Sequence, residues 1–291
     1  MYRFVHSSAS EAVNASASNN PGAYYDPCGS PYRLEGVVGR KMIFCGALIT
    51  YYALEDIIQV CEGCLQYSAR CCAHKYENRA CHHYRLIFTD GACSGNGWGE
   101  SAAGEFLLNA SFPLRRPLYS GIGVVLGQRG FGIDSFSLAV TDAMDPGQRR
   151  TSQRAELLAA IEGVRRSAFG DVHSYYGNAP KARIIVSDSE YVVRGMTEWL
   201  PQWKRNWYRT AQGATPVNLD LFLLLDSEIE RLEAGSNFKF GFWHVPRHLN
   251  FEADRLAKAG AAAAWEMMAT VIKHSMSSPI LGCLGVSTVE L

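Results

Sequence analysis

The chain has 291 residues, of which 47% are hydrophobic and 19% charged, and this composition fits a soluble globular protein with a real core. Lysine and arginine total 28, as do aspartate and glutamate, so net charge does not indicate a polyanionic partner, and a nucleic-acid site must be a local patch. The longest strongly apolar run without charge, residues 42–54, is shorter than the roughly 20 residues that cross a bilayer, so we expect no membrane segment.

Cysteine usage bears on the compartment. The nine cysteines are an odd number, and the first residues lack the basic start and apolar core of a secretory signal. We therefore expect reduced thiols and an intracellular protein, in the nucleus or cytoplasm rather than the mitochondrion. Nothing in the sequence indicates an obligate protein partner, so a monomer is the expectation.

Local composition divides the chain into four parts. Residues 1–37 are rich in Ser, Ala, Asn, Gly and Pro and are expected to be loose. Residues 38–83 form an extension rich in Cys and His, residues 84–268 form the main domain, and residues 269–291 form a tail.

Regular hydrophobic periodicity begins at residue 85 and predicts alternating elements. Strands are expected at 85–89, 119–126, 131–140, 183–188 and 238–245. Helices are expected at 151–168, 189–200, 218–232 and from Asn250 onward, where Asn is a residue type that caps helices. Three strands in a run, followed by strands alternating with helices, predict an α/β domain with a mixed five-stranded sheet flanked by helices.

Four acidic residues fall at the ends of these elements. Asp90 and Asp188 end strands, while Glu156 and Asp254 lie in the first turns of helices. Strand C-termini and helix N-termini share one rim in such a fold, so we expect the four carboxylates to converge. Taken singly, each could be a turn residue or a partner of a helix dipole. Together they would repel one another unless divalent cations were bound, and oxygen ligands favour Mg²⁺ or Mn²⁺.

Four successive stretches resemble ribonuclease H type 1 in order and spacing, over about residues 84–264. They read FTDGACSGN, TSQRAELLAAIEGV, VSDSEYVVRGMTEWLPQWKRNW and VPRHLNFEADRLAKAGA. The resemblance implies an RNase H-like fold in which Asp90, Glu156, Asp188 and Asp254 are catalytic, metal-binding carboxylates. It also implies a hydrolase, namely an endonuclease that cuts the RNA strand of RNA/DNA hybrids and leaves 5′-phosphate and 3′-hydroxyl ends. Two Mg²⁺ ions would be the cofactors, and Mn²⁺ could replace them.

The resemblance also implies how the hybrid is held. Trp199 matches the residue that lines the DNA channel, within a stretch that interleaves aromatic and basic side chains as nucleic-acid grooves do. Ser152 stands where the family often has Asn. The remaining implied contacts are Asn96 and Gln153 toward the hybrid, and Arg149, Thr151 and Asn218 in a pocket for a DNA phosphate.

One departure concerns the loop before the last acid, which is compressed to VPRHLNFEAD. Many members of the family carry a longer loop whose histidine helps proton movement and product release. His248 is the nearest match and is our candidate for that catalytic role, which Arg247 would share.

The extension contains the runs CEGC, CCAH and CHH. They supply Cys61, Cys64, Cys71, Cys72, His74, Cys81, His82 and His83. A CxxC with a second Cys/His group could hold Zn²⁺, but the second half lacks the usual partner spacing. The sequence therefore favours buried free thiols over a zinc site.

Two alternatives remain open at this point. A hybrid- or double-stranded-RNA-binding protein with decayed catalysis would fit the shortened histidine loop. Another two-metal nuclease of the same fold, such as a 3′–5′ exonuclease or a transposase, would also use carboxylates. Exonucleases would show Asp-x-Glu on the first strand, where this chain has Asp90, Gly91 and Ala92.

Overall fold

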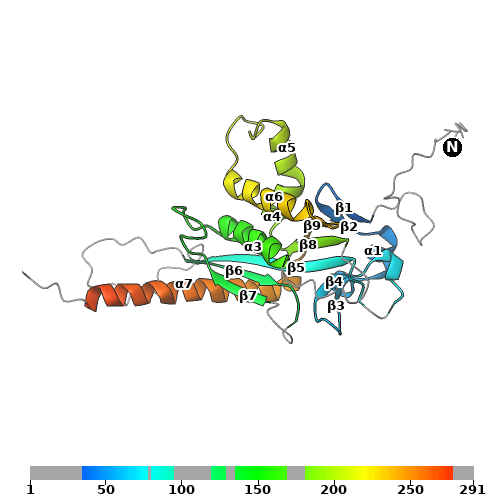
Figure 1. The fold of residues 1–291 in the computed structure, drawn as a ribbon, viewed down its shortest axis with the longest axis horizontal. Helices are drawn as coiled ribbons and strands as arrows, with labels where there is room; N and C mark the ends of the chain where they lie inside the picture. The colour runs from blue at the N-terminus through cyan, green and yellow to red at the C-terminus, as the bar shows by residue number, and fades with distance from the viewer. Residues whose placement is uncertain (1–34, 78–79, 95–118, 129–134, 169–180, 278–291) are drawn as a thin grey trace, which may run out of the picture.

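The computed structural model describes residues 35–77, 80–94, 119–128, 135–168 and 181–277. The five expected strands form the centre of one mixed sheet in the order β7-β6-β5-β8-β9 (Figure 1). Their bounds are β5 (Tyr84–Ser94), β6 (Tyr119–Val125), β7 (Ser135–Ala139), β8 (Ala182–Ser187) and β9 (Lys239–His244). Strand β6 is antiparallel to both β5 and β7, whereas β8 runs parallel to both β5 and β9. The predicted order of strands and helices is confirmed.

One predicted boundary is wrong: the first strand does not end near Asp90. The parallel ladder between β5 and β8 stops at Phe88, but the antiparallel ladder with β6 continues to Ser94. Hydrogen bonding to β6 therefore keeps the chain extended through the glycine that follows Asp90. Part of the predicted strand 131–140 lies outside the described residues.

The N-terminal extension enlarges the sheet at two places. The hairpin β1 (Gly36–Val38) and β2 (Lys41–Ile43) adds to β9, and the hairpin β3 (Ile58–Val60) and β4 (Tyr67–Ala69) adds to the start of β5. The described ranges thus contain a nine-stranded sheet. Short helices join these strands: α1 (Gly46–Tyr51), α2 (Leu54–Ile57) and the 3₁₀ turn η1 (Cys72–His74).

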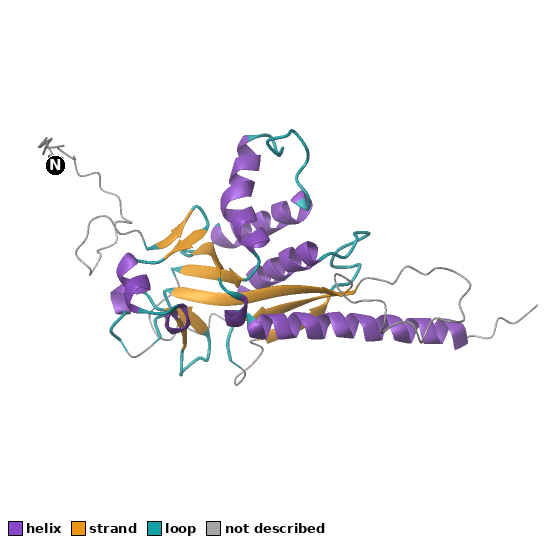
Figure 2. Ribbon diagram, turned by 180° about the vertical axis from the view of Figure 1, so that it is seen from behind, coloured by secondary structure: helices purple, strands orange, loops and turns teal. Residues whose placement is uncertain are grey.

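Helices cover both faces of the sheet, as Figure 2 shows from behind. On one face lie α3 (Ser152–Ser167), α4 (Glu190–Arg194), the π-helical turn η3 (Gly195–Trp199), α5 (Leu200–Arg205) and α6 (Leu219–Glu233). On the other face lies α7 (Phe251–Ser277), which follows the 3₁₀ turn η4 (Arg247–Leu249) and extends beyond the sheet. None of the helices in the described ranges combines the length and apolar character that a membrane crossing requires.

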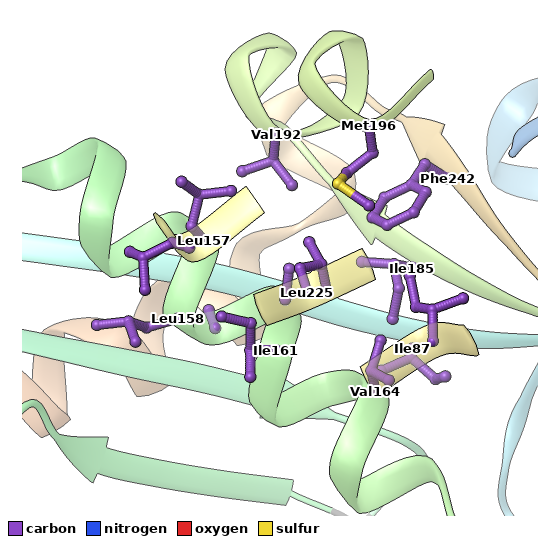
Figure 3. Close-up of a cluster of buried hydrophobic side chains, with 14 of the residues drawn as sticks. Ile87, Leu157, Leu158, Ile161, Val164, Ile185, Val192, Met196, Leu225 and Phe242 are labelled. Atoms are coloured by element: carbon purple, nitrogen blue, oxygen red, sulfur yellow. The ribbon is translucent and has the colours of Figure 1, made fainter. Parts of the chain in front are cut away.

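Two hydrophobic cores hold these layers together. The first joins the sheet to α3, α4 and α6, with Ile87, Ile161, Ile185, Leu225 and Phe242 among its members (Figure 3). All five side chains are 1% exposed or less, so their burial is a main source of stability.

The second core lies on the face that α7 covers. Leu86, Phe88 and Val245 meet Ala253 of α7 there, and the extension supplies half of the other buried side chains. Those from the extension are Met42, Cys45, Leu48, Ile57, Ala69, Cys71 and Cys72. The extension therefore shares both a sheet and a core with the main domain.

Candidate active site

Asp90 lies on β5, and Asp188 directly follows the neighbouring strand β8. In the parallel ladder Phe88 lies opposite Val186, and each acid follows two residues later. Neighbouring strands are about 4.8 Å apart, so the two side chains start from adjacent positions at one edge of the sheet. Side chains alternate along a strand, so Asp90 points to the same face as Phe88, the face covered by α7.

Glu156 reaches this edge because α3 packs directly on Gly91. A methyl group at Gly91 would lie 2.2 Å from the main-chain carbon of Ala155 and 2.2 Å from the main-chain nitrogen of Glu156. Only glycine permits that approach. The residue after Asp90 thus fixes where the first turns of α3 lie.

A second glycine positions α7 and therefore Asp254. Gly123 lies opposite Asp90 in the β5–β6 ladder, and a methyl group there would lie 2.1 Å from the carbonyl oxygen of Ala253. Helix α7 consequently crosses β6 next to Asp90 with its first turn, which carries Asp254. The four predicted carboxylates are brought to the same edge of the sheet from four different elements.

The charges of these acids act on one another. Burial raises the pKa of Asp90 to about 7, and the nearby carboxylates of Asp188, Asp254 and Glu156 contribute to this increase. Burial also raises the pKa of Glu156, with a further contribution from Asp188. Asp90 is 8% exposed, so little water screens the repulsion. A cluster of this kind gains stability from bound divalent cations.

Two neighbouring side chains hold the acids in place. The hydroxyl of Ser189 donates to Glu156 Oε2 at 2.5 Å, and Ser189 also caps α4. The amide of Asn250 donates to Asp188 Oδ1 at 2.6 Å and to the carbonyl oxygen of Thr89 at 3.1 Å. Sequence reasoning missed both contacts, although Ser189 directly follows one acid.

The residue type of Asn250 suggested that its side chain caps α7, but the structure shows that it does not. The side-chain oxygen is buried without a hydrogen-bond partner, while the main-chain oxygen accepts the N–H of Asp254. The amide nitrogen is directed to Asp188 and Thr89 instead. Contacts to the sheet therefore determine the orientation of this side chain.

Asp254 is held by two cations. Arg247 Nη2 lies 2.5 Å from Oδ1, and Lys258 Nζ lies 2.6 Å from Oδ2. Burial works to raise the pKa of Asp254, but the hydrogen bonds from Lys258 and Arg247 outweigh it and leave the pKa below its ordinary value. The Arg247 guanidinium also interacts with the charges of Asp188 and Asp90.

His248 is directed elsewhere. Its Nε2 lies 3.1 Å from Glu55 Oε1 of α2, and its side chain is 65% exposed. No contact between His248 and the four acids is seen among the described residues. The catalytic role of His248 therefore stays a prediction, and Arg247 and Asn250 are the residues of this loop seen to contact one of the four acids.

Two of the three residues predicted to hold a DNA phosphate, Thr151 and Asn218, contact Arg154. The main-chain N–H of Arg154 donates to Thr151 Oγ1 at 3.2 Å, and Nη1 donates to Asn218 Oδ1 at 3.2 Å. Asn218 has φ 55°, an uncommon backbone conformation for a residue other than glycine, and also donates to the hydroxyl of Tyr191 at 3.1 Å. Sequence reasoning did not single out Arg154, although it lies within the same motif.

Arg154 itself is buried and paired. It donates to both carboxylate oxygens of Asp145, at 2.9 and 2.6 Å, and to Asp220 at 2.7 Å. The hydrogen bonds to Asp145 raise its pKa further above the ordinary arginine value, so the group is a permanent cation. Arg149 is exposed and lies three residues before the start of α3.

The other predicted contacts are placed as follows. Trp199 is half-buried and lies edge-on to Tyr191, with ring centroids 5.7 Å apart. Ser152 and Gln153 are the first residues of α3, and Gln153 is exposed. Asn96 lies outside the described residues.

The Cys/His residues of the extension form groups that could hold a metal ion. Cys71, His74, Cys81 and His83 bring four ligand atoms within 4.8 Å of one another, and Cys61, Cys64 and His82 bring three. The sequence pattern did not indicate this arrangement, because the first group combines residues that lie on both sides of a loop.

Comparison with known proteins agrees with the geometry. The family model for RNase H matches residues 82–262. Ribonuclease H1 of Homo sapiens is 31% identical over 180 residues, which cover 60% of this chain and 49% of that protein. Ribonuclease H of Bordetella bronchiseptica is 32% identical over 183 residues, which cover 61% of this chain and 89% of that protein. The chain thus spans about half the length of the mammalian relatives it matches.

Among solved structures, RNase H1 from Halobacterium salinarum NRC-1 covers 62% of this chain and 99% of its own, at 20% identity. Its TM-score of 0.36 adds no weight to the assignment, which depends on the sequence match. The match spans the region that carries all four carboxylates and more than half of the chain. This chain therefore belongs to the RNase H family.

Proposed function

We propose that this chain hydrolyses the RNA strand of RNA/DNA hybrids by two-metal-ion catalysis, leaving 5′-phosphate and 3′-hydroxyl ends. The main support is the convergence of Asp90, Glu156, Asp188 and Asp254, where burial and the charges of the other three acids together raise the pKa of Asp90 to about 7. Family membership supports the same reading.

The donor set fits Mg²⁺ or Mn²⁺. All four side chains offer hard oxygen ligands, and the repulsion at Asp90 is of the kind that divalent cations relieve. When bound there, two such ions would activate a water molecule and take up charge on the leaving oxygen. We propose that Asp90, Glu156, Asp188 and Asp254 are the ligands.

Neighbouring residues prepare the acids for this role. Ser189 and Asn250 each direct a carboxylate oxygen by a hydrogen bond, so the acids need little rearrangement. Arg247 and Lys258 balance the charge of Asp254 and would have to release at least one of its oxygens before that oxygen binds a metal ion.

We propose that the hybrid is held on both strands. Thr151 and Asn218, linked through Arg154, would bind a phosphate of the DNA strand together with the exposed Arg149. Trp199 would line the path of that strand, while Ser152, Gln153 and Asn96 would contact the hybrid in the minor groove, where the 2′-hydroxyl distinguishes RNA from DNA.

The test is cleavage of an end-labelled RNA/DNA hybrid with Mg²⁺ present. We expect internal cuts in the RNA strand, 5′-phosphate products, and no cleavage of duplex DNA. Asp90→Asn should abolish cutting. Asp56 is an exposed acid on α2, so Asp56→Asn should leave cutting unchanged and serves as the matched control.

Two outcomes would overturn the proposal. Tight hybrid binding without cleavage would indicate a binding protein whose catalysis has decayed. Trimming from one end, or equal cleavage by Asp90→Asn, would indicate another nuclease mechanism or a contaminating activity.

A further inference from the structure

A compact Cys/His group lies outside the candidate active site, at the junction of the extension and the main sheet. Ala69 of β4 lies opposite Tyr84 of β5 in an antiparallel ladder, so the chain leaving β4 and the chain entering β5 are at the same end. Cys71 follows β4, and η1 then places His74 beside it. Cys81 and His83 come directly before β5.

The four side chains of this group are directed at one point. Cys71 Sγ lies 3.1 Å from His74 Nδ1, 3.3 Å from Cys81 Sγ and 3.5 Å from His83 Nδ1. Zinc bonds of about 2.0–2.3 Å in tetrahedral geometry would place ligand atoms about 3.3–3.8 Å apart. The observed separations are therefore close to those of a zinc site.

The chemistry of the ligands selects the metal. Two thiolates and two imidazoles form a soft, closed tetrahedral set, which suits Zn²⁺ and disfavours Mg²⁺. Free thiols would not need two imidazole nitrogens directed at the same sulfur. A Cys71–Cys81 disulfide would likewise leave both histidines without a role.

The neighbouring group differs in one respect. Cys61, Cys64 and His82 bring three ligands together, with Cys64 Sγ 3.5 Å from His82 Nε2. This set has one ligand fewer than a closed structural site contains. The group around Cys71 is complete with its own four residues.

We propose that Cys71, His74, Cys81 and His83 bind one structural zinc ion that fastens the N-terminal extension to β5. The strands of the extension are three residues long, too short to be stable alone. They are nevertheless part of the core that buries Leu86 and Phe88 of β5. The zinc ion thus stabilises one end of the strand whose other half carries Asp90.

The first experiment measures metal content in the full-length chain purified without chelator. We expect zinc, and we expect Cys71→Ser and Cys81→Ser each to contain one equivalent less than the wild type. Cys93→Ser is the matched control, because Cys93 is a free thiol outside these groups, and it should retain the wild-type content. Equal zinc in the wild type and Cys71→Ser would overturn the proposal.

A second measurement keeps the test decisive if these variants fold poorly. Wild-type protein exchanged into Co²⁺ should show the visible bands of tetrahedral thiolate-bound cobalt, and Cys71 and Cys81 should resist alkylation until the metal is removed. A Cys71–Cys81 disulfide in unreduced protein, or prompt alkylation of both thiols, would overturn the proposal. Asp90→Asn should retain the zinc, so this result is independent of whether the chain cleaves hybrids.

Discussion

Asn250 links the end of β8 to the middle of β5: its amide donates to Asp188 Oδ1 at 2.6 Å and to the carbonyl oxygen of Thr89 at 3.1 Å. Thr89 directly precedes Asp90, so one buried amide sets the position of one acid and supports the backbone of the other. Asn250 is 1% exposed, and water cannot replace its hydrogen bonds.

Replacing Asn250 by Ala should therefore lower kcat and weaken Mg²⁺ activation. Losing the amide removes a donor from the buried carbonyl oxygen of Thr89, which costs about 1–3 kcal/mol in unfolding free energy, and another from the half-buried carboxylate of Asp188. Mg²⁺ titrations of hybrid cleavage, together with chemical denaturation, would measure both effects. Asn206→Ala, whose side chain bonds only local carbonyl oxygens at the end of α5, should change neither kcat nor Mg²⁺ activation.

Replacing Arg247 by Gln should lower the Mg²⁺ concentration needed for half-maximal cleavage. The guanidinium competes with metal for Asp254, and an exposed pair of this kind contributes about 0.2–1 kcal/mol, or up to about fivefold in metal affinity. Lys258→Gln should act in the same direction through the other oxygen. An increased requirement in both variants would show that these cations assist metal binding.

Asp90 should make the protein without bound Mg²⁺ less stable as pH rises. Its pKa of about 7 in the folded state exceeds the ordinary 3.8, so between these values the folded protein holds a proton that the unfolded chain has lost. The free energy of unfolding should fall across this window by at most about 1.4 kcal/mol per pH unit.

Asp90→Asn removes this loss because its amide has no charge to bury and none for the other acids to repel. Thermal melts without added Mg²⁺ should show the variant more stable than the wild type at pH 8 and similar to it near pH 4. Chelator is left out so that the zinc ion proposed at the Cys71 group stays bound. Added Mg²⁺ should stabilise the wild type more than the variant. A variant less stable than the wild type at pH 8 would contradict the assigned repulsion.

Arg149→Ala and Trp199→Ala should raise KM with smaller effects on kcat, since both residues are predicted to bind the DNA strand away from the acids. Arg149→Ala should also reduce the slope of log affinity against log salt by about 1. Arg205→Ala removes an exposed cation at the end of α5 and tests whether the loss of another positive charge changes KM and the salt slope in the same way. An unchanged KM for both variants would remove the assignment of a DNA channel.

Gly91→Ala should be strongly destabilising and inactive. Its methyl group would meet the backbone of Ala155 and Glu156 at 2.2 Å, and backbone cannot yield as a side chain can. We expect a loss of about 1–3 kcal/mol or more in unfolding free energy. Gly235→Ala has open space around it and should be close to neutral in the same denaturation experiment.

The sequence by itself determined the order of elements and singled out the four acids, because hydrophobic periodicity and the short motif around each acid are local properties. Asp90, Glu156, Asp188 and Asp254 each belong to a recognisable stretch. Their meeting at one edge of the sheet follows from general rules of α/β topology.

Only the tertiary structure decided which neighbours those acids have. Asn250 and Arg154 are ordinary residues in the sequence, and their partners at positions 188 and 218 lie more than sixty residues away. The Cys71 group depends likewise on the pairing of β4 with β5, which sets residues from both sides of a loop around one point. Contacts of this kind arise from strand register and helix packing, and no local pattern encodes them.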